Sequence, residues 1–135
     1  MKTRGLSWLP ALTVMAVIFL FSSLPGDQVP LPGFRFSDKV AHLAIYTLLG
    51  MALAWRLGSK AQVKGVRAAP IPVWDWLGLS YGWIYAASDE VHQIFVPGRH
   101  AGWDDWSADA VGIALGLAVV RLSRRKLTGN SLEPG

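Results

Sequence analysis

The sequence contains no cysteine and few charged residues. Without cysteine the chain can form neither disulfide bonds nor thiolate metal sites, and its redox compartment cannot be inferred. Only 16% of the 135 residues are charged and 52% are hydrophobic, whereas typical soluble domains have about 25% charged residues. The net charge of +4 comes from short basic segments between apolar runs. This pattern favours membrane topology signals and argues against nucleic acid as a partner.

Four apolar runs predict four membrane-spanning helices. A spanning helix needs about 20 residues, and the runs reach that length when their polar ends are included. The first run lacks an A-x-A-like cleavage pattern and stops at Pro25-Gly26, so we expect a retained helix and not a signal peptide. The sequence therefore predicts an all-α, integral membrane four-helix bundle over residues 1–127. We place the spans at about 6–24, 38–56, 71–90 and 104–122, and a flexible cytoplasmic tail at 128–135.

The distribution of lysine and arginine predicts the orientation of these helices. Ten of the basic residues lie at the N-terminus, between the second and third runs, and in the C-terminal tail. The other two connections contain three, namely Arg35, Lys39 and Arg99. The positive-inside rule then places both termini in the cytoplasm of a multi-pass cell membrane protein.

Three polar clusters fall at the helix ends that this topology places outside. They are Asp38-Lys39-x-x-His42 with Tyr46, Asp89-Glu90-x-x-Gln93, and Arg99 with Asp104-Asp105-x-x-x-Asp109. Charged groups near hydrocarbon usually face a bundle interior or a wet cavity. Taken singly, each has a structural explanation, such as Asp38 capping a helix or Asp104 and Asp105 complementing a helix dipole. Their common location predicts one shared extracytoplasmic site.

Stripes of small residues support this convergence. Gly78, Gly82 and Ala86 are four residues apart, as are Ala108, Gly112 and Gly116. Small residues at this spacing let membrane helices approach closely, and both stripes continue outward to the acidic residues.

The clusters contain candidate acid–base, binding and metal-ligating groups. Crowded carboxylates relieve their repulsion by retaining protons or by binding a cation. Candidate catalytic residues are His42, Asp89, Glu90 and Asp105. Candidate substrate-binding residues are Asp38, Lys39, Tyr46, Gln93, Arg99 and Asp109. A divalent cation at the carboxylate–histidine cluster is the cofactor that this chemistry suggests, without defining its ligands.

These motifs resemble the VanZ-like membrane proteins, a family named for a component associated with teicoplanin resistance. The resemblance rests on Trp8-Leu9-Pro10 with Ser22-Ser23, on the Asp38 to Tyr46 motif, and on Glu90-x-x-Gln93-x-Phe95-x-Pro97-Gly98-Arg99 followed by Asp105-x-x-x-Asp109-x-x-Gly112. The family often has Asn at the position of Asp109. The resemblance implies a bacterial helical membrane protein with these residues on the extracytoplasmic side, and it supplies no reaction.

Three functions remain open on this evidence. The first is binding or modulation of a lipid-linked cell-envelope component, such as a cell-wall precursor, or of an amphiphilic glycopeptide antibiotic. The second is a small membrane enzyme that acts on a lipid or lipid-linked substrate by acid–base or metal-assisted chemistry. The third is a subunit of a proton-linked transporter, which would require an oligomer because four helices are few for a complete pathway.

Overall fold

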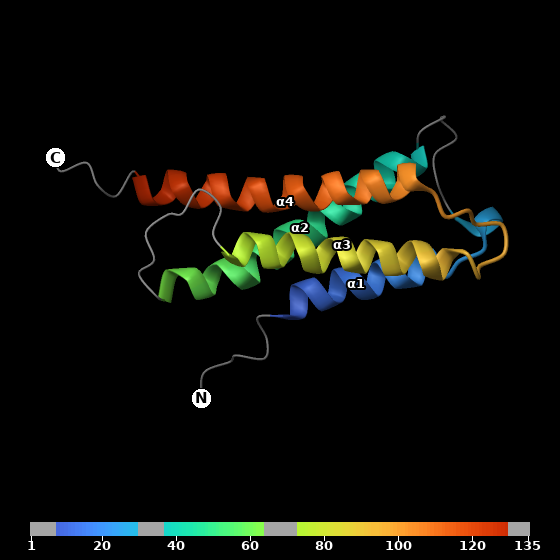
Figure 1. Cartoon of the computed structure of the whole chain (residues 1–135), viewed down its shortest axis with the longest axis horizontal. Helices are drawn as coiled ribbons and strands as arrows, with labels where there is room; N and C mark the ends of the chain where they lie inside the picture. Colours follow the sequence, from blue (N-terminus) through green and yellow to red (C-terminus); the bar gives the residue numbers. More distant parts are fainter. Residues whose placement is uncertain (1–7, 30–36, 64–72, 130–135) are drawn as a thin grey trace.

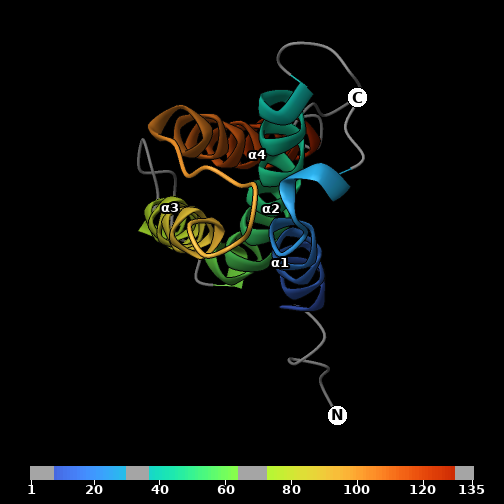
Figure 2. The same ribbon diagram turned by 90° about the vertical axis from the view of Figure 1, so that its right-hand side faces the viewer.

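The computed structural model describes residues 8–29, 37–63 and 73–129, which form four α-helices and one short 3-10 helix. The helices are α1 (Leu9–Ser22), α2 (Ser37–Val63), α3 (Val73–Gln93) and α4 (Trp103–Gly129), and η2 (Gly26–Gln28) follows α1. They form an elongated bundle in which α2 packs against each of the other three helices (Figures 1 and 2). The all-α architecture predicted from the sequence is thus observed.

Local sequence explains several of the helix ends. Pro10 lies in the first turn of α1, where its missing N–H removes no helical hydrogen bond. At the other end of α1, Ser23 N–H donates to the carbonyl of Phe19, and Pro25 follows. The first turn of α4 contains Asp104 and Asp105, whose negative charges complement the positive end of the helix dipole.

The observed helix lengths differ from the predicted spans. The first helix has 14 residues, shorter than the predicted span of 6–24, whereas α2 and α4 have 27 residues each and extend past their predicted ends. Because α4 continues to Gly129, the first two residues of the predicted tail are helical; residues 130–135 of that tail lie outside the described residues. Among the described residues, two segments are long and apolar enough to cross a membrane, Ser37–Leu57 and Trp103–Arg125, and Leu9–Ser22 is a shorter apolar helix.

The closest helix contact joins α2 and α4 through glycines. A Cβ atom on Gly112 would lie 2.7 Å from the carbonyl oxygen of Leu43, and one on Gly116 would lie 2.6 Å from the backbone nitrogen of Met51. On α2, Gly50 likewise faces the backbone of Ile113. Because no side chain separates the two backbones here, the N-terminal turns of α2 and α4 are brought together.

The glycines of α3 receive side chains from α4. A Cβ atom on Gly82 would lie 2.9 Å from Ile113, and one on Gly78 would lie 3.0 Å from Leu117. Both of these α4 side chains are buried, as are Leu49 and Leu53 of α2. The small-residue stripes therefore pack α4 against two helices at once, as small residues do in membrane bundles.

The two ends of the bundle differ in their polar groups. The C-termini of α1 and α3 meet the N-termini of α2 and α4 at one end, on the right of Figure 1. We call this the polar end, because the three acidic clusters lie there. At the opposite end, Nη1 of Arg121 lies 3.3 Å from Oδ2 of Asp75, and the guanidinium of Arg56 lies over the ring of Trp8. Between the ends, the outer surface exposes large apolar side chains, among them Leu20, Ile84 and Leu48.

Candidate functional site

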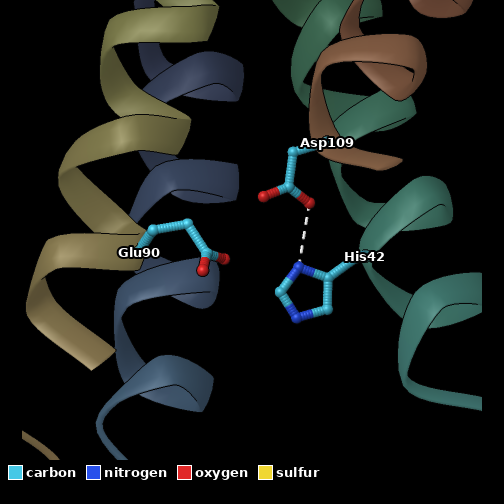
Figure 3. A group of neighbouring side chains, drawn as sticks. All are labelled: His42, Glu90 and Asp109. Atoms are coloured by element: carbon cyan, nitrogen blue, oxygen red, sulfur yellow. Dashed lines mark hydrogen bonds and ion pairs between the residues drawn. The ribbon is translucent and has the colours of Figure 1, made fainter. Parts of the chain in front are cut away.

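The centre of the polar end is a group of three side chains from three helices. His42 of α2, Glu90 of α3 and Asp109 of α4 each place one nitrogen or oxygen within 4.8 Å of the others. Figure 3 shows the three side chains directed towards a common space. Nδ1 of His42 and Oδ1 of Asp109 lie 2.9 Å apart and share a hydrogen bond. We call this group the His42–Glu90–Asp109 cluster.

Two oxygens of this cluster are buried without a hydrogen-bond partner among the described residues. They are Oε1 of Glu90 and Oδ2 of Asp109. Glu90 has one partner on its other oxygen, which accepts from the backbone N–H of Gly102 at 2.9 Å. The whole Asp109 residue has 0% of its surface exposed. Buried polar atoms normally have partners, so each exception needs an explanation such as an ion or ordered water.

Asp89 occupies a different environment beside this cluster. Its Oδ2 atom accepts hydrogen bonds from Ser22 Oγ at 2.8 Å, Tyr46 OH at 3.1 Å and Gln93 Nε2 at 3.2 Å. All four residues are buried. Three donors can stabilise a buried carboxylate by hydrogen bonding alone. Because these donors belong to α1, α2 and α3, the side chain of Asp89 also links the three helices at the polar end.

Lys39 and Arg99, the lysine and arginine of the polar end that the structure describes, are both held by other groups. Lys39 Nζ forms ion pairs with Asp104 and, at 2.7 Å, with Oδ1 of Asp105. Arg99 donates from Nη2 to the carbonyl of Phe21 at 2.8 Å and from Nε to that of Leu24 at 3.2 Å. Arg99 thus satisfies carbonyls at the C-terminus of α1. Neither cation is paired with Glu90 or Asp109 in this arrangement.

Two cavities flank the cluster. The first measures about 220 Å³ and lies between α1 and α2, with apolar walls from Ile18, Phe21 and Ile45. Its polar lining comes from Ser22, Asp38, His42, Tyr46, Asp89 and Arg99. The second measures about 450 Å³ and lies between α3 and α4, where Glu90, Trp103 and Trp106 line it. Because His42 lines one cavity and Glu90 the other, the cluster lies between them.

The structure brings most of the predicted site residues to one end and divides them into groups. His42, Glu90 and Asp109 form the central cluster, and Tyr46, Asp89 and Gln93 form the hydrogen-bonded group beside it. Lys39 and Asp105 pair with each other, while Arg99 binds the end of α1 and Asp38 lines the first cavity. Their roles in binding or catalysis stay predictions.

Two groups that donate hydrogen bonds to acidic residues of the polar end were not among the predicted site residues. Ser22 donates to Asp89, and the N–H of Gly102 donates to Glu90. A serine that ends an apolar helix at the same end as the acidic clusters was the available signal for Ser22. Nothing in the sequence distinguishes the backbone N–H of Gly102. Near Ser22, Ser23 Oγ and His92 Nε2 lie 3.0 Å apart, so His92 also contacts α1.

A bundle with apolar outer surfaces, two helices of membrane-spanning length and buried acidic groups at one end has the features of a helical membrane protein. The chain belongs to the VanZ/LLP1 family, whose model matches residues 7–124. The resemblance drawn from the sequence motifs is thereby confirmed. No curated protein and no solved structure matches this chain.

Proposed function

We propose that this chain is a multi-pass membrane protein that binds an amphiphile through the polar end of its bundle. The observation that supports the proposal is the first cavity, which combines apolar walls from α1 and α2 with a cap of polar side chains. Ligand sites commonly have this form, with a few polar groups setting orientation in a largely apolar pocket. The tail of an amphiphile would contact Ile18 and Ile45, and its head would face Asp38 and His42.

The charges of the cavity favour a head group with hydroxyl or amine donors. Asp38 contributes an acceptor to the lining, whereas the guanidinium of Arg99 already donates to backbone carbonyls. Saccharides and amines supply such donors. We therefore favour the saccharide part of a lipid-linked cell-envelope component or of an amphiphilic glycopeptide such as teicoplanin.

The proposed orientation places this cavity on the extracytoplasmic side, with both termini in the cytoplasm. The positive-inside rule supports it, since ten of thirteen Lys and Arg residues fall on the other side. At the end opposite the polar end, Arg56 and Arg124 lie over the rings of Trp8 and Trp55. Such tryptophans are typical of membrane interfaces. Four of the ten, Lys2, Arg4, Lys64 and Arg67, lie outside the described residues.

Filling the cavity tests the proposal. The protein, reconstituted in lipid nanodiscs, would be titrated with teicoplanin and with a saccharide-bearing polyprenyl pyrophosphate as separate probes. Ala41 lines the first cavity, and Ala41→Phe should lower the affinity for a bound probe at least tenfold. Ala44 is exposed on the same helix, so Ala44→Phe is the matched control and should leave affinity unchanged. Equal binding by both variants, or binding of neither probe to the original protein, would contradict the proposal.

A second candidate function is acid–base catalysis on the same amphiphile. The hydrogen bond to Asp109 uses Nδ1 of His42 and leaves Nε2 for a bound molecule, and His42 lines the first cavity. An imidazole oriented by a carboxylate in this way is suited to serve as a general base. Mass spectrometry of each probe after incubation with the protein tests this function: a product that His42→Gln no longer forms would support it, and unchanged probes would count against it.

A further inference from the structure

We propose that the His42–Glu90–Asp109 cluster binds one divalent cation between α2, α3 and α4. The cluster offers one imidazole and two carboxylates, and one ligand atom of each lies within 4.8 Å of the others. Ligation through Nδ1 of His42 would replace its hydrogen bond to Asp109. In Figure 3 the oxygens of Glu90 and Asp109 face the same space beside the ring of His42. The proposal goes beyond amphiphile binding and does not depend on it, since a cation can bind here with the cavities empty of ligand.

The buried oxygens without partners are the independent observation that points to a cation. Oε1 of Glu90 and Oδ2 of Asp109 have no hydrogen-bond donor within the part of the chain that the structure describes. Both belong to buried residues on different helices, so neither can turn outward to water without moving its helix or changing its rotamer. A cation contacting both oxygens would give each of them a partner.

The neighbouring charges lead to the same conclusion. Asp89 is also buried, yet three hydrogen-bond donors surround it. Lys39 is held by Asp104 and Asp105 nearer the surface, and Arg99 is held by carbonyls of α1. The central cluster therefore contains two carboxylates, and among the described residues no lysine or arginine is paired with either of them; the imidazole of His42 contacts Asp109 alone. Crowded carboxylates of this kind favour an added positive charge.

The donor set favours a transition-series cation such as Zn²⁺ or Mn²⁺. Imidazole suits Zn²⁺ and carboxylates suit Mn²⁺, whereas Ca²⁺ takes about 6–8 oxygen ligands. Tetrahedral zinc sites hold ligand atoms roughly 3.4 Å apart, on bond lengths of about 2.1 Å. The three side chains would therefore move together by about 1 Å through small rotations. Three protein ligands leave a coordination position open, as in catalytic zinc sites.

Metal titration of purified protein tests this proposal directly. Protein in detergent would be stripped with a chelator and titrated with Zn²⁺, Mn²⁺, Mg²⁺ and Ca²⁺ by calorimetry. We expect one equivalent of Zn²⁺ or Mn²⁺ to bind, more tightly than Mg²⁺ or Ca²⁺. His42→Ala, Glu90→Gln and Asp109→Asn should each lower affinity at least tenfold. Absence of binding to the original protein, or affinity unchanged in all three variants, would overturn the proposal.

Two acidic residues outside the cluster are matched controls. Asp75→Asn changes a carboxylate paired with Arg121 at the opposite end of the bundle, and Asp104→Asn changes an exposed one. Both variants should bind one equivalent with the affinity of the original protein. Folding is monitored in parallel by the melting temperature, which the cation should raise in the original protein and in both controls but not in Glu90→Gln. A melting temperature that rises equally in Glu90→Gln would contradict the assignment.

Discussion

His42 and Asp109 are joined across the interface of α2 and α4 by a hydrogen bond of 2.9 Å from Nδ1 to Oδ1. One turn further along α4, Gly112 packs against the backbone of α2 near Leu43. The two helices can approach closely enough for the bond because Gly112 has no side chain. Packing and site chemistry are therefore linked: whatever separates α2 from α4 should also disturb His42 and Asp109.

A side chain at Gly116 should separate these helices. A Cβ atom there would lie 2.6 Å from the nitrogen of Met51 and 2.9 Å from the carbonyl carbon of Gly50. Both neighbours are backbone atoms, so Gly116→Ala should lower the free energy of unfolding by about 1–3 kcal/mol, as overpacking does. Thermal unfolding in detergent measures the loss. Ala118→Val on the exposed face of the same helix should change stability little, and equal losses would show that helix contact is not the cause.

Asp89 and Ser22 should be energetically coupled. Removing either partner leaves the other buried polar group with one interaction fewer, which costs about 1–3 kcal/mol. A double-mutant cycle with Ser22→Ala and Asp89→Asn should give an interaction energy of about 0.5–3 kcal/mol. The exposed Ser88, whose hydroxyl donates to the carbonyl of Tyr85, is the control: Ser88→Ala should be additive with Asp89→Asn. If Ser22→Ala is also additive with Asp89→Asn, the hydrogen bond between Ser22 and Asp89 contributes nothing to stability.

Loss of Arg99 should loosen the end of α1. Its guanidinium donates to the carbonyls of Phe21 and Leu24, and the nearby N–H of Gly26 donates to Pro97 at 3.1 Å. Arg99→Ala should therefore increase hydrogen–deuterium exchange at residues 22–28, because α1 loses a contact with the turn after α3. His100→Ala alters an exposed neighbour and should leave exchange unchanged. Unaltered exchange in Arg99→Ala would contradict this prediction and would show that the Arg99 guanidinium does not hold the end of α1 in place.

Single-cysteine labelling should report the orientation in cells without background, because the chain has no cysteine. His100 is exposed in the connection from α3 to α4, at the polar end, and Ser123 is exposed near the C-terminus of α4, at the opposite end. A membrane-impermeant maleimide should label His100→Cys in intact cells and Ser123→Cys only after permeabilisation. The reverse pattern would place the polar end in the cytoplasm and invert the proposed topology.

The sequence indicated the helices and the composition of the site because both depend on spacing along one chain segment. Asp38, His42 and Tyr46 share a helix face at four-residue intervals, and small residues marked the faces that pack. Contacts between side chains of different helices could not be predicted in this way. The pairing of Asp89 with Ser22, and of Lys39 with Asp105, depends on how each helix is rotated and shifted against its neighbour. No pattern within one segment encodes that register.

The partition of the acidic residues shows the same limit. Their common location predicted one shared group of crowded carboxylates, whereas in the structure Asp89 accepts three hydrogen bonds and Asp105 pairs with Lys39. Only Glu90 and Asp109 retain buried oxygens without partners among the described residues. The candidate cation site therefore consists of the two carboxylates that keep buried oxygens without partners. They can be recognised only once the partners of the neighbouring acids are known from the three-dimensional structure.

The most direct test of this account is an anomalous diffraction map from crystals of the protein grown with Mn²⁺. The account predicts a single strong peak in contact with Oε1 of Glu90 and Oδ2 of Asp109, next to the imidazole of His42, and no peak there in crystals of Glu90→Gln. Well-ordered crystals that show these side chains without an anomalous peak between them would contradict it, as would a peak located only at Asp104 or another surface carboxylate.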